Sequence, residues 1–185
     1  MACADSAGPA AQLRPVTHAE FARFVAATGY VTDAERYGWS VVQRNVYDFE
    51  VVEGATWRRP DGRRGPPSDE LPVTQVSLND AEAYCAWAGA RLPSYDEYWR
   101  LVAGDERPIV VEHARPISEA RAVNVVGNVW ELTAGTVHPD SVRLAGGSVF
   151  CSPATCDGTA PARELYVDRE TANVHIGFAV VDRER

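Results

Sequence analysis

The sequence contains no lysine, so all 18 residues in its combined lysine and arginine count are arginine. Without a lysine side chain, the protein cannot form a Schiff base, use a lysine general base or supply the lysine of a phosphate-binding P-loop. The 26 acidic residues give a formal net charge of −8, which argues against the basic surface typical of nucleic-acid-binding proteins. No stretch of ~18 consecutive apolar residues is present, so no membrane-spanning helix is predicted.

The start of the chain also lacks a basic segment followed by an apolar stretch, so no secretory signal peptide is predicted. We therefore expect a cytoplasmic protein whose partners are neither nucleic acid nor membrane. A length of 185 residues favours a single domain. Residues 1–13 are mostly small and are expected to form a flexible arm ahead of a domain spanning residues 14–185. The lysine-free, arginine-rich composition is associated with GC-rich bacterial genomes.

Short patterns predict three helices in the first part of the chain. Each begins with a capping box, in which a serine or threonine precedes an acidic residue by three positions. These boxes are Thr17–Glu20, Ser77–Asp80 and Ser94–Glu97. Gly29 and Gly89 are expected to end the first two helices, and the third is expected to run through Leu101.

The remaining segments predict loops and short strands. Residues 30–57 carry aromatic and β-branched runs, and residues 58–70 form a loop rich in glycine, proline and charge. Short strands and turns are expected from residue 121 onward. A few early helices followed by short strands predict an α+β fold with much loop.

Four cysteines in an intracellular chain do not predict a disulfide framework, so each needs its own interpretation. Cys151 and Cys156 are five residues apart, and a continuous strand would point their sulfur atoms to opposite faces. Pro153 interrupts such a strand and allows a loop that brings the two thiols together. Two convergent thiolates suit Cu(I), but two unrelated core thiols or a loop disulfide fit the same spacing. Cys85 is expected to be a packed core thiol, and Cys3 lies in the predicted arm.

A second cluster of possible ligands lies in the segment N-V-V-G-N-V-W-E, residues 124–131. Asn124 and Glu131 offer side-chain oxygens, and a tight glycine turn could expose the carbonyl oxygens of Gly127 and Val129. A hard cation such as Ca²⁺ prefers such an all-oxygen set. The alternative is a plain Gly-Asn turn followed by a surface glutamate.

The histidines and Ser148 give no separate sign of catalysis. No two histidines share a metal-ligand spacing, and each is expected to be structural or solvated; they are His18, His113, His138 and His175. Ser148 follows two glycines but lacks the G-x-S-x-G context and an evident histidine or aspartate partner. A serine hydrolase is therefore not expected.

Taken together and in order, several longer segments resemble the formylglycine-generating enzyme family. The matching stretches are residues 16–40, Trp57 with the Arg-Arg-Pro that follows it, 72–99, 124–133, 144–151 and 176–181. The resemblance covers residues 16–182 with one large gap. It implies a single-domain, irregular, loop-rich α+β fold related to C-type lectins and stabilised by calcium.

The resemblance also implies roles for individual residues. Cys151 and Cys156 would bind Cu(I), and Ser148 would lie beside that copper site. Trp130 would line the substrate groove. The calcium ligands would be Asn124, Gly127, Val129 and Glu131. In the family, a substrate thiol joins the copper, O₂ binds, a Cβ hydrogen is abstracted, and the resulting thioaldehyde hydrolyses to an aldehyde.

The chain departs from this family in several places. Only 23 residues separate Arg100 from Asn124, where the family has several times more. A leading strand before the first helix is not expected here. Family arginines are replaced by Ala145, the segment 157–159 and Ala179, so a changed substrate is expected. The helical domain that supplies a histidine triad in related ergothioneine sulfoxide synthases is absent, which argues against non-haem iron chemistry.

These observations favour a copper-dependent oxidase that uses O₂ on a thiol-containing substrate, either a small molecule or a cysteine of a peptide or carrier, as a biosynthetic tailoring enzyme. The alternative is a non-catalytic, lectin-like binding or partner protein on the same scaffold. A third hypothesis is sulfatase maturation by a minimal enzyme. A shortened groove would be completed by a homo-oligomer or another partner chain.

Overall fold

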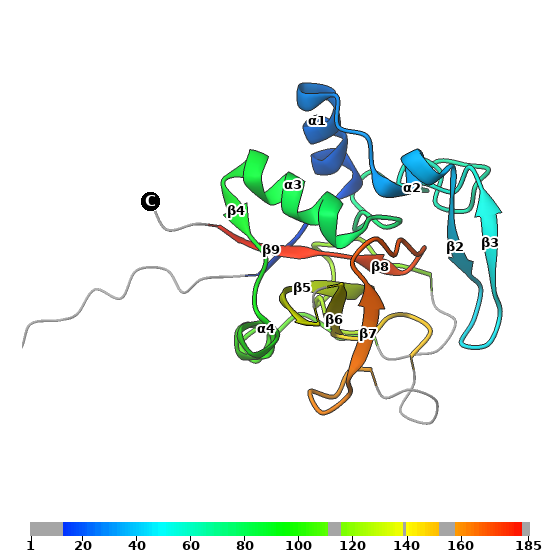
Figure 1. Ribbon diagram of the computed structural model, residues 1–185. Coiled ribbons are helices and arrows are strands. Elements are labelled where there is room, and N and C mark those ends of the chain that lie inside the picture. The colour runs from blue at the N-terminus through cyan, green and yellow to red at the C-terminus, as the bar shows by residue number, and fades with distance from the viewer. Residues whose placement is uncertain (1–12, 111–115, 139, 152–157, 183–185) are drawn as a thin grey trace, which may run out of the picture.

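The computed structural model describes residues 13–110, 116–138, 140–151 and 158–182. It has the predicted α+β architecture, with helices mainly in the first half of the chain and short strands throughout (Figure 1). The helices are α1 (His18–Thr28), α2 (Asp33–Tyr37), α3 (Leu78–Ala88) and α4 (Tyr95–Val102). The strands are β1 (Arg14–Pro15), β2 (Trp39–Gln43), β3 (Phe49–Glu53), β4 (Ala90–Arg91), β5 (Trp130–His138), β6 (Ser141–Ala145), β7 (Leu165–Asp168), β8 (Ile176–Gly177) and β9 (Ala179–Asp182).

The three predicted helices are confirmed, together with the caps that start them. At α1, the Thr17 hydroxyl accepts a hydrogen bond from Glu20 N, and the Glu20 carboxylate accepts one from Thr17 N. The same reciprocal pairs begin α3 and α4. Gly29 and Gly89 end α1 and α3 in the left-handed conformation that glycine favours.

The sequence interpretation missed helix α2. Thr32 and Glu35 form another capping box, and Gly38 ends the helix with a φ of 77°. Residues 30–57 were interpreted only as aromatic and β-branched runs, but the Thr-x-x-Glu pattern that revealed α1 is present here as well. The five residues of α2 are too few for an apolar helical repeat to be visible.

The strands form three small sheets. In the first, β9 lies between β1 and β4, and in the second, β2 and β3 make an antiparallel hairpin. The third has the order β7-β6-β5-β8, in which β5 and β8 are parallel. Helices α1 and α3 lie on one side of β9, and the four-stranded sheet lies on the other (Figure 1). The expectation of no strand before the first helix was wrong, because Arg14 and Pro15 pair with Val180 and Ala179.

The core between α1, α3 and β9 is built around aromatic rings. The Phe21 ring lies 5.3 Å from the Phe24 ring and 5.2 Å from the Trp57 ring, both in edge-on contacts. It also contacts the rings of Tyr84 and Phe178. Because rings from α1, α3 and Phe178, which directly precedes β9, all contribute to this cluster, it packs the two helices against that strand.

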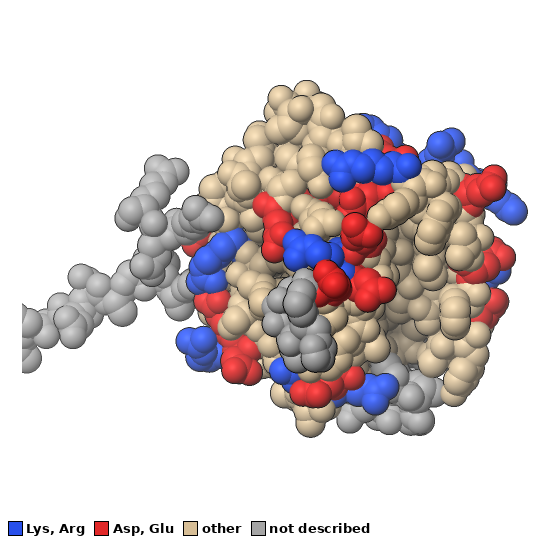
Figure 2. Space-filling model, in the orientation of Figure 1, with Lys and Arg blue, Asp and Glu red and all other residues tan. Residues whose placement is uncertain are grey.

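The surface carries both signs of charge. On the face shown in Figure 2, arginine side chains alternate with aspartate and glutamate rather than forming a patch of one sign. Within the described part of the chain, no helix is long and apolar enough to cross a membrane.

We expect the Phe21→Ala substitution to lower the free energy of unfolding by about 3–5 kcal/mol, because it leaves a cavity in the aromatic cluster. Phe49 is a matched control because its side chain is 66% exposed. Phe49→Ala should change the free energy of unfolding by no more than about 0.5 kcal/mol. Denaturant unfolding of both variants measures the difference, and equal losses would contradict this view of the core.

Candidate metal centre and its surroundings

Two glycines shape the turn that carries Ser148. Gly146 and Gly147 follow β6 with φ values of 85° and 70°, which other residues rarely adopt. A Cβ atom on Gly147 would lie 2.7 Å from the backbone carbon of Gly158, so only glycine lets these two segments approach each other. The turn therefore brings Gly147, the residue before Ser148, against Gly158.

Three of the four predicted catalytic residues meet around this turn. The Ser148 carbonyl oxygen accepts a hydrogen bond from Cys151 N at 2.7 Å. A Cβ atom on Gly158 would lie 2.8 Å from Trp130 Cη2 and 2.9 Å from Cys151 Sγ, so the indole edge and the sulfur both border this glycine. Cys151 and Trp130 are only 4% and 3% exposed.

The fourth predicted residue, Cys156, lies outside the described residues, as do Cys3 and His113. Cys151 itself is disulfide-bonded in the structure. A disulfide was one of the alternatives that the Cys-x₄-Cys spacing left open. Cys85 is buried on α3 within the aromatic core, as expected from the sequence.

The sequence interpretation missed the partner of Ser148. Its Oγ atom lies 2.8 Å from Nδ1 of His175, and both side chains are buried. Burial lowers the pKa of His175 to about 3, so the imidazole is neutral. The two residues are 27 positions apart, and no local motif links them. They meet because β8 pairs with β5, and the His175 carbonyl oxygen accepts a hydrogen bond from Trp130 N at 2.8 Å.

This Ser–His contact does not form a hydrolase centre. The Ser148 side chain is fully buried, whereas a nucleophilic hydroxyl must reach its substrate. Among the described residues, the imidazole of His175 has its hydrogen bond with Ser148 and none with a carboxylate, so no acidic side chain orients the ring. The pair holds the turn in place rather than attacking a substrate.

The predicted calcium segment places a carboxylate in the interior. Glu131 is 1% exposed, so the alternative of a surface glutamate is wrong. Its Oε2 atom has no hydrogen-bond partner among the described residues, and burial raises its pKa to about 8. The nearby Tyr98 hydroxyl is also buried without a described partner, and its pKa is raised by burial and then by the Glu131 charge.

The other predicted oxygens lie in the turn just before Glu131. Asn124 Oδ1 accepts a hydrogen bond from Val126 N at 2.9 Å. The carbonyl oxygens of Gly127 and Val129 accept no hydrogen bond within the described part of the chain. A buried carboxylate oxygen without a hydrogen-bond partner and two unpaired carbonyl oxygens, all in one segment of the chain, are the oxygen types that a hard cation prefers. The described residues hold no group of three or more His, Cys, Asp and Glu side chains suited to a metal.

The structure also shows where two of the residues that replace family arginines lie. Ala145 and Ala179 are each 1% exposed and pack in one apolar cluster with Tyr98 and Val126. These positions therefore lie inside the protein and offer no guanidinium to a substrate. The third replaced family arginine corresponds to the segment 157–159. In this segment Gly158 lies against Trp130, and Asp157 is outside the described residues.

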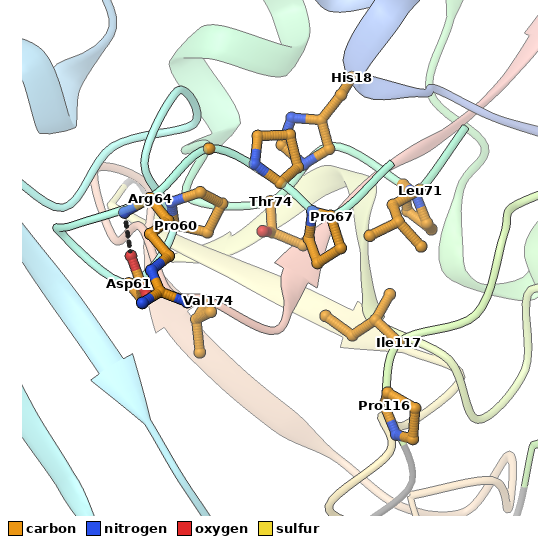
Figure 3. A pocket seen from close by; sticks show the side chains of 13 residues that line it. His18, Pro60, Asp61, Arg64, Pro67, Leu71, Thr74, Pro116, Ile117 and Val174 are labelled. Carbon is orange, nitrogen blue, oxygen red and sulfur yellow. Dashed lines mark hydrogen bonds between the residues drawn. The ribbon is translucent and has the colours of Figure 1, made fainter. Parts of the chain in front are cut away.

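A pocket of about 400 Å³ is lined in part by Val174, the residue that directly precedes His175 in the sequence (Figure 3). Its walls are mainly prolines and aliphatic side chains, including Pro67, Leu71, Ile117 and Val174. The ring of His18 lies over the pocket in Figure 3, and burial lowers the pKa of His18 to about 4. Val174 lines the pocket, and the next residue in the sequence is His175, the partner of Ser148.

Comparison with known proteins places the chain in a family. Residues 11–107 match the sulfatase-modifying factor enzyme 1-like domain. The chain is 30% identical to the inactive C-alpha-formylglycine-generating enzyme 2 of Mus musculus, and the match covers 94% of this chain and 78% of that protein. It is 29% identical to the formylglycine-generating enzyme of Mycobacterium tuberculosis, covering 93% and 86%.

Two further similarities concern chemistry and fold. The chain is 33% identical to the hercynine oxygenase of Mycolicibacterium smegmatis, over 68% of this chain and 36% of that protein. The structure of PvdO from Pseudomonas aeruginosa has the same fold, with a TM-score of 0.61 at 17% identity over 92% of this chain and 78% of that one. The chain is a member of the sulfatase-modifying factor family, to which formylglycine-generating enzymes belong.

Proposed function

We propose that the protein is a copper-dependent oxidase that uses O₂ to oxidise a thiol-containing substrate, with Cys151 and Cys156 as the Cu(I) ligands. Family membership and the hercynine oxygenase relative support an oxidative enzyme. The observation that carries the copper proposal is the position of Cys151 Sγ, buried beside the Trp130 indole and next to Ser148. A soft thiolate in an apolar, water-poor setting fits Cu(I).

The residues around Cys151 have separable tasks in this proposal. Cu(I) held by two thiolates would supply a redox centre with room for a substrate sulfur and O₂. Trp130 and Gly158 close one side of the sulfur and keep water away from it. The carbonyl of Ser148 fixes the Cys151 backbone. Because Cys151 is disulfide-bonded in the structure, it must be reduced before it binds the metal.

The pocket beside Val174 supports a small thiol over a long peptide as substrate. Its volume of about 400 Å³ is that of a small-molecule site, and its walls are largely apolar. A carrier-bound or peptide cysteine is the second form of the same proposal.

We also propose that Ca²⁺ binds at the turn of residues 124–131. The supporting observations are the unpartnered Glu131 Oε2 atom and the unpaired carbonyl oxygens of Gly127 and Val129. A divalent cation would compensate the buried Glu131 charge, and Asn124 would add a side-chain oxygen. Since Glu131 pairs with Ala145 and Gly177 in the central sheet, the cation would stabilise the strands that carry the copper site.

A non-catalytic binding protein is the second candidate function. One relative that matches nearly the whole chain is an inactive member of the family. Ala145 and Ala179 are also buried in the core instead of presenting charged side chains to a groove. The two candidates differ in whether copper and O₂ chemistry are present.

For the copper proposal, we expect Cys151→Ser and Cys156→Ser each to weaken Cu(I) binding at least ~100-fold, or about 2.7 kcal/mol, because a single thiolate cannot hold the ion linearly. Reduced protein is titrated with Cu(I) against a chelator, and O₂ uptake is followed with benzyl mercaptan as probe. Cys85→Ala is the matched control and should bind as the wild type does. Weak wild-type binding, or equal binding by the serine variants, contradicts the proposal. Tight binding without O₂ uptake favours the second candidate.

For the calcium proposal, Ca²⁺ at ~100 times its Kd should stabilise the wild type by about 2.7 kcal/mol. This corresponds to a Tm increase of roughly 5–10 °C for a chain of this size. Glu131→Gln should lose the calcium-dependent part of the Tm, whereas the exposed control Glu106→Gln should retain it. Thermal unfolding with Ca²⁺ and with chelator measures both. An identical Tm with and without the ion in the wild type would remove the proposed site.

A further inference from the structure

The Ser148–His175 pair is a buried polar contact that the proposed copper chemistry does not use. Ser148 Oγ and His175 Nδ1 are 2.8 Å apart, and the two residues are 0% and 6% exposed. A buried hydroxyl without a partner is costly, so each group satisfies the other.

His175 is held at its backbone and is in contact with an aromatic ring. Its backbone carbonyl oxygen accepts a hydrogen bond from Trp130 N at 2.8 Å. The Phe150 ring lies 5.2 Å from the imidazole centre, at an interplanar angle of 55°. Phe150 also donates a long hydrogen bond of 3.4 Å from its backbone nitrogen to Ser148 Oγ. In this arrangement Nδ1 of the ring is directed at the serine.

Ser148 in turn is linked directly to the candidate copper ligand. Its carbonyl oxygen accepts the hydrogen bond from Cys151 N at 2.7 Å. The chain of contacts therefore runs from Trp130 through His175 and Ser148 to Cys151. A serine hydroxyl normally rotates to suit its surroundings, but an imidazole fixed at hydrogen-bond distance removes that freedom.

We propose that His175 is a positioning residue that fixes Ser148 and, through the hydrogen bond from Cys151 N to the Ser148 carbonyl oxygen, holds the Cys151 sulfur in place at the proposed copper centre. The inference rests on the proposed function, because it assigns the pair a role in the same oxidation. His175 acts through Ser148 and does not touch the substrate. Burial keeps the imidazole neutral at physiological pH, so the contact is independent of its titration.

Two amide substitutions separate this role from simple packing. The amide of asparagine branches from Cγ, where Nδ1 of histidine is attached, so His175→Asn can keep the hydrogen bond to Ser148. The amide of glutamine lies one carbon farther out, near the position of Nε2, so His175→Gln removes it. Both variants lose the ring equally, which makes them a matched pair.

We expect His175→Gln to lower kcat roughly 100-fold, the size of effect that a misplaced group produces, with little change in KM. His175→Asn should retain most of the wild-type kcat. Ser148→Ala should match His175→Gln, and the double variant should be no slower than Ser148→Ala, because the two residues act as one unit. Cu(I) affinity and Tm of every variant are measured in parallel.

The outcomes distinguish this inference from the proposed function. A wild type without copper-dependent O₂ uptake overturns both. If the wild type is active, three results overturn the positioning role alone. These are a His175→Gln variant as active as the wild type, equal losses of kcat in the two amide variants, and additive losses in the double variant. If His175→Gln fails to fold, the ¹⁵N chemical shift of His175 Nδ1 decides: it should change in Ser148→Ala, and an unchanged shift overturns the pair.

Discussion

The hydrogen bond from Trp130 N to the His175 carbonyl oxygen joins the two chain segments on which the site depends. It begins the short parallel pairing of β5 with β8, in which Trp130 lies opposite Ile176. Through this pairing, the indole is placed against Gly158 and Cys151, and the imidazole reaches Ser148. A contact between residues far apart in the sequence therefore assembles side chains that no local motif could bring together.

The same strand carries an electrostatic constraint. Glu131 follows Trp130 directly and enters the interior, where its Oε2 atom has no described partner. A buried carboxylate is tolerated only when it is protonated or compensated by a positive charge. A cation at this turn would therefore stabilise β5 itself. In the proposed enzyme, the calcium site and the copper site would be coupled because adjacent residues of one strand serve both.

The local parts of the fold were predictable, whereas the contacts across the fold were not. The capping boxes at Thr17, Ser77 and Ser94 are complete within four residues, so the sequence alone indicates where three helices begin. The box at Thr32 has the same signal and was overlooked because the helix is short. Strand β1 has only two residues and depends on β9, about 165 positions later, so no local pattern reveals it.

For the site, resemblance to a family identified the residue types, and the structure added their relations. Ser148, Cys151 and Trp130 were predicted and lie together. His175 was expected to be structural or solvated, because no two histidines in the sequence share a metal-ligand spacing. Its partner became visible only when β8 was placed beside β5. Cys156 lies outside the described residues, so its place in the copper pair remains a prediction.

The central claim is a Cu(I) ion held by the sulfur atoms of Cys151 and Cys156. X-ray absorption spectroscopy of the reduced, Cu(I)-loaded protein tests it most directly. The proposed centre predicts a two-coordinate copper with sulfur neighbours only, and a third sulfur neighbour when a thiol such as benzyl mercaptan is added. Copper surrounded by nitrogen or oxygen atoms, or a spectrum unchanged by Cys151→Ser, would contradict it.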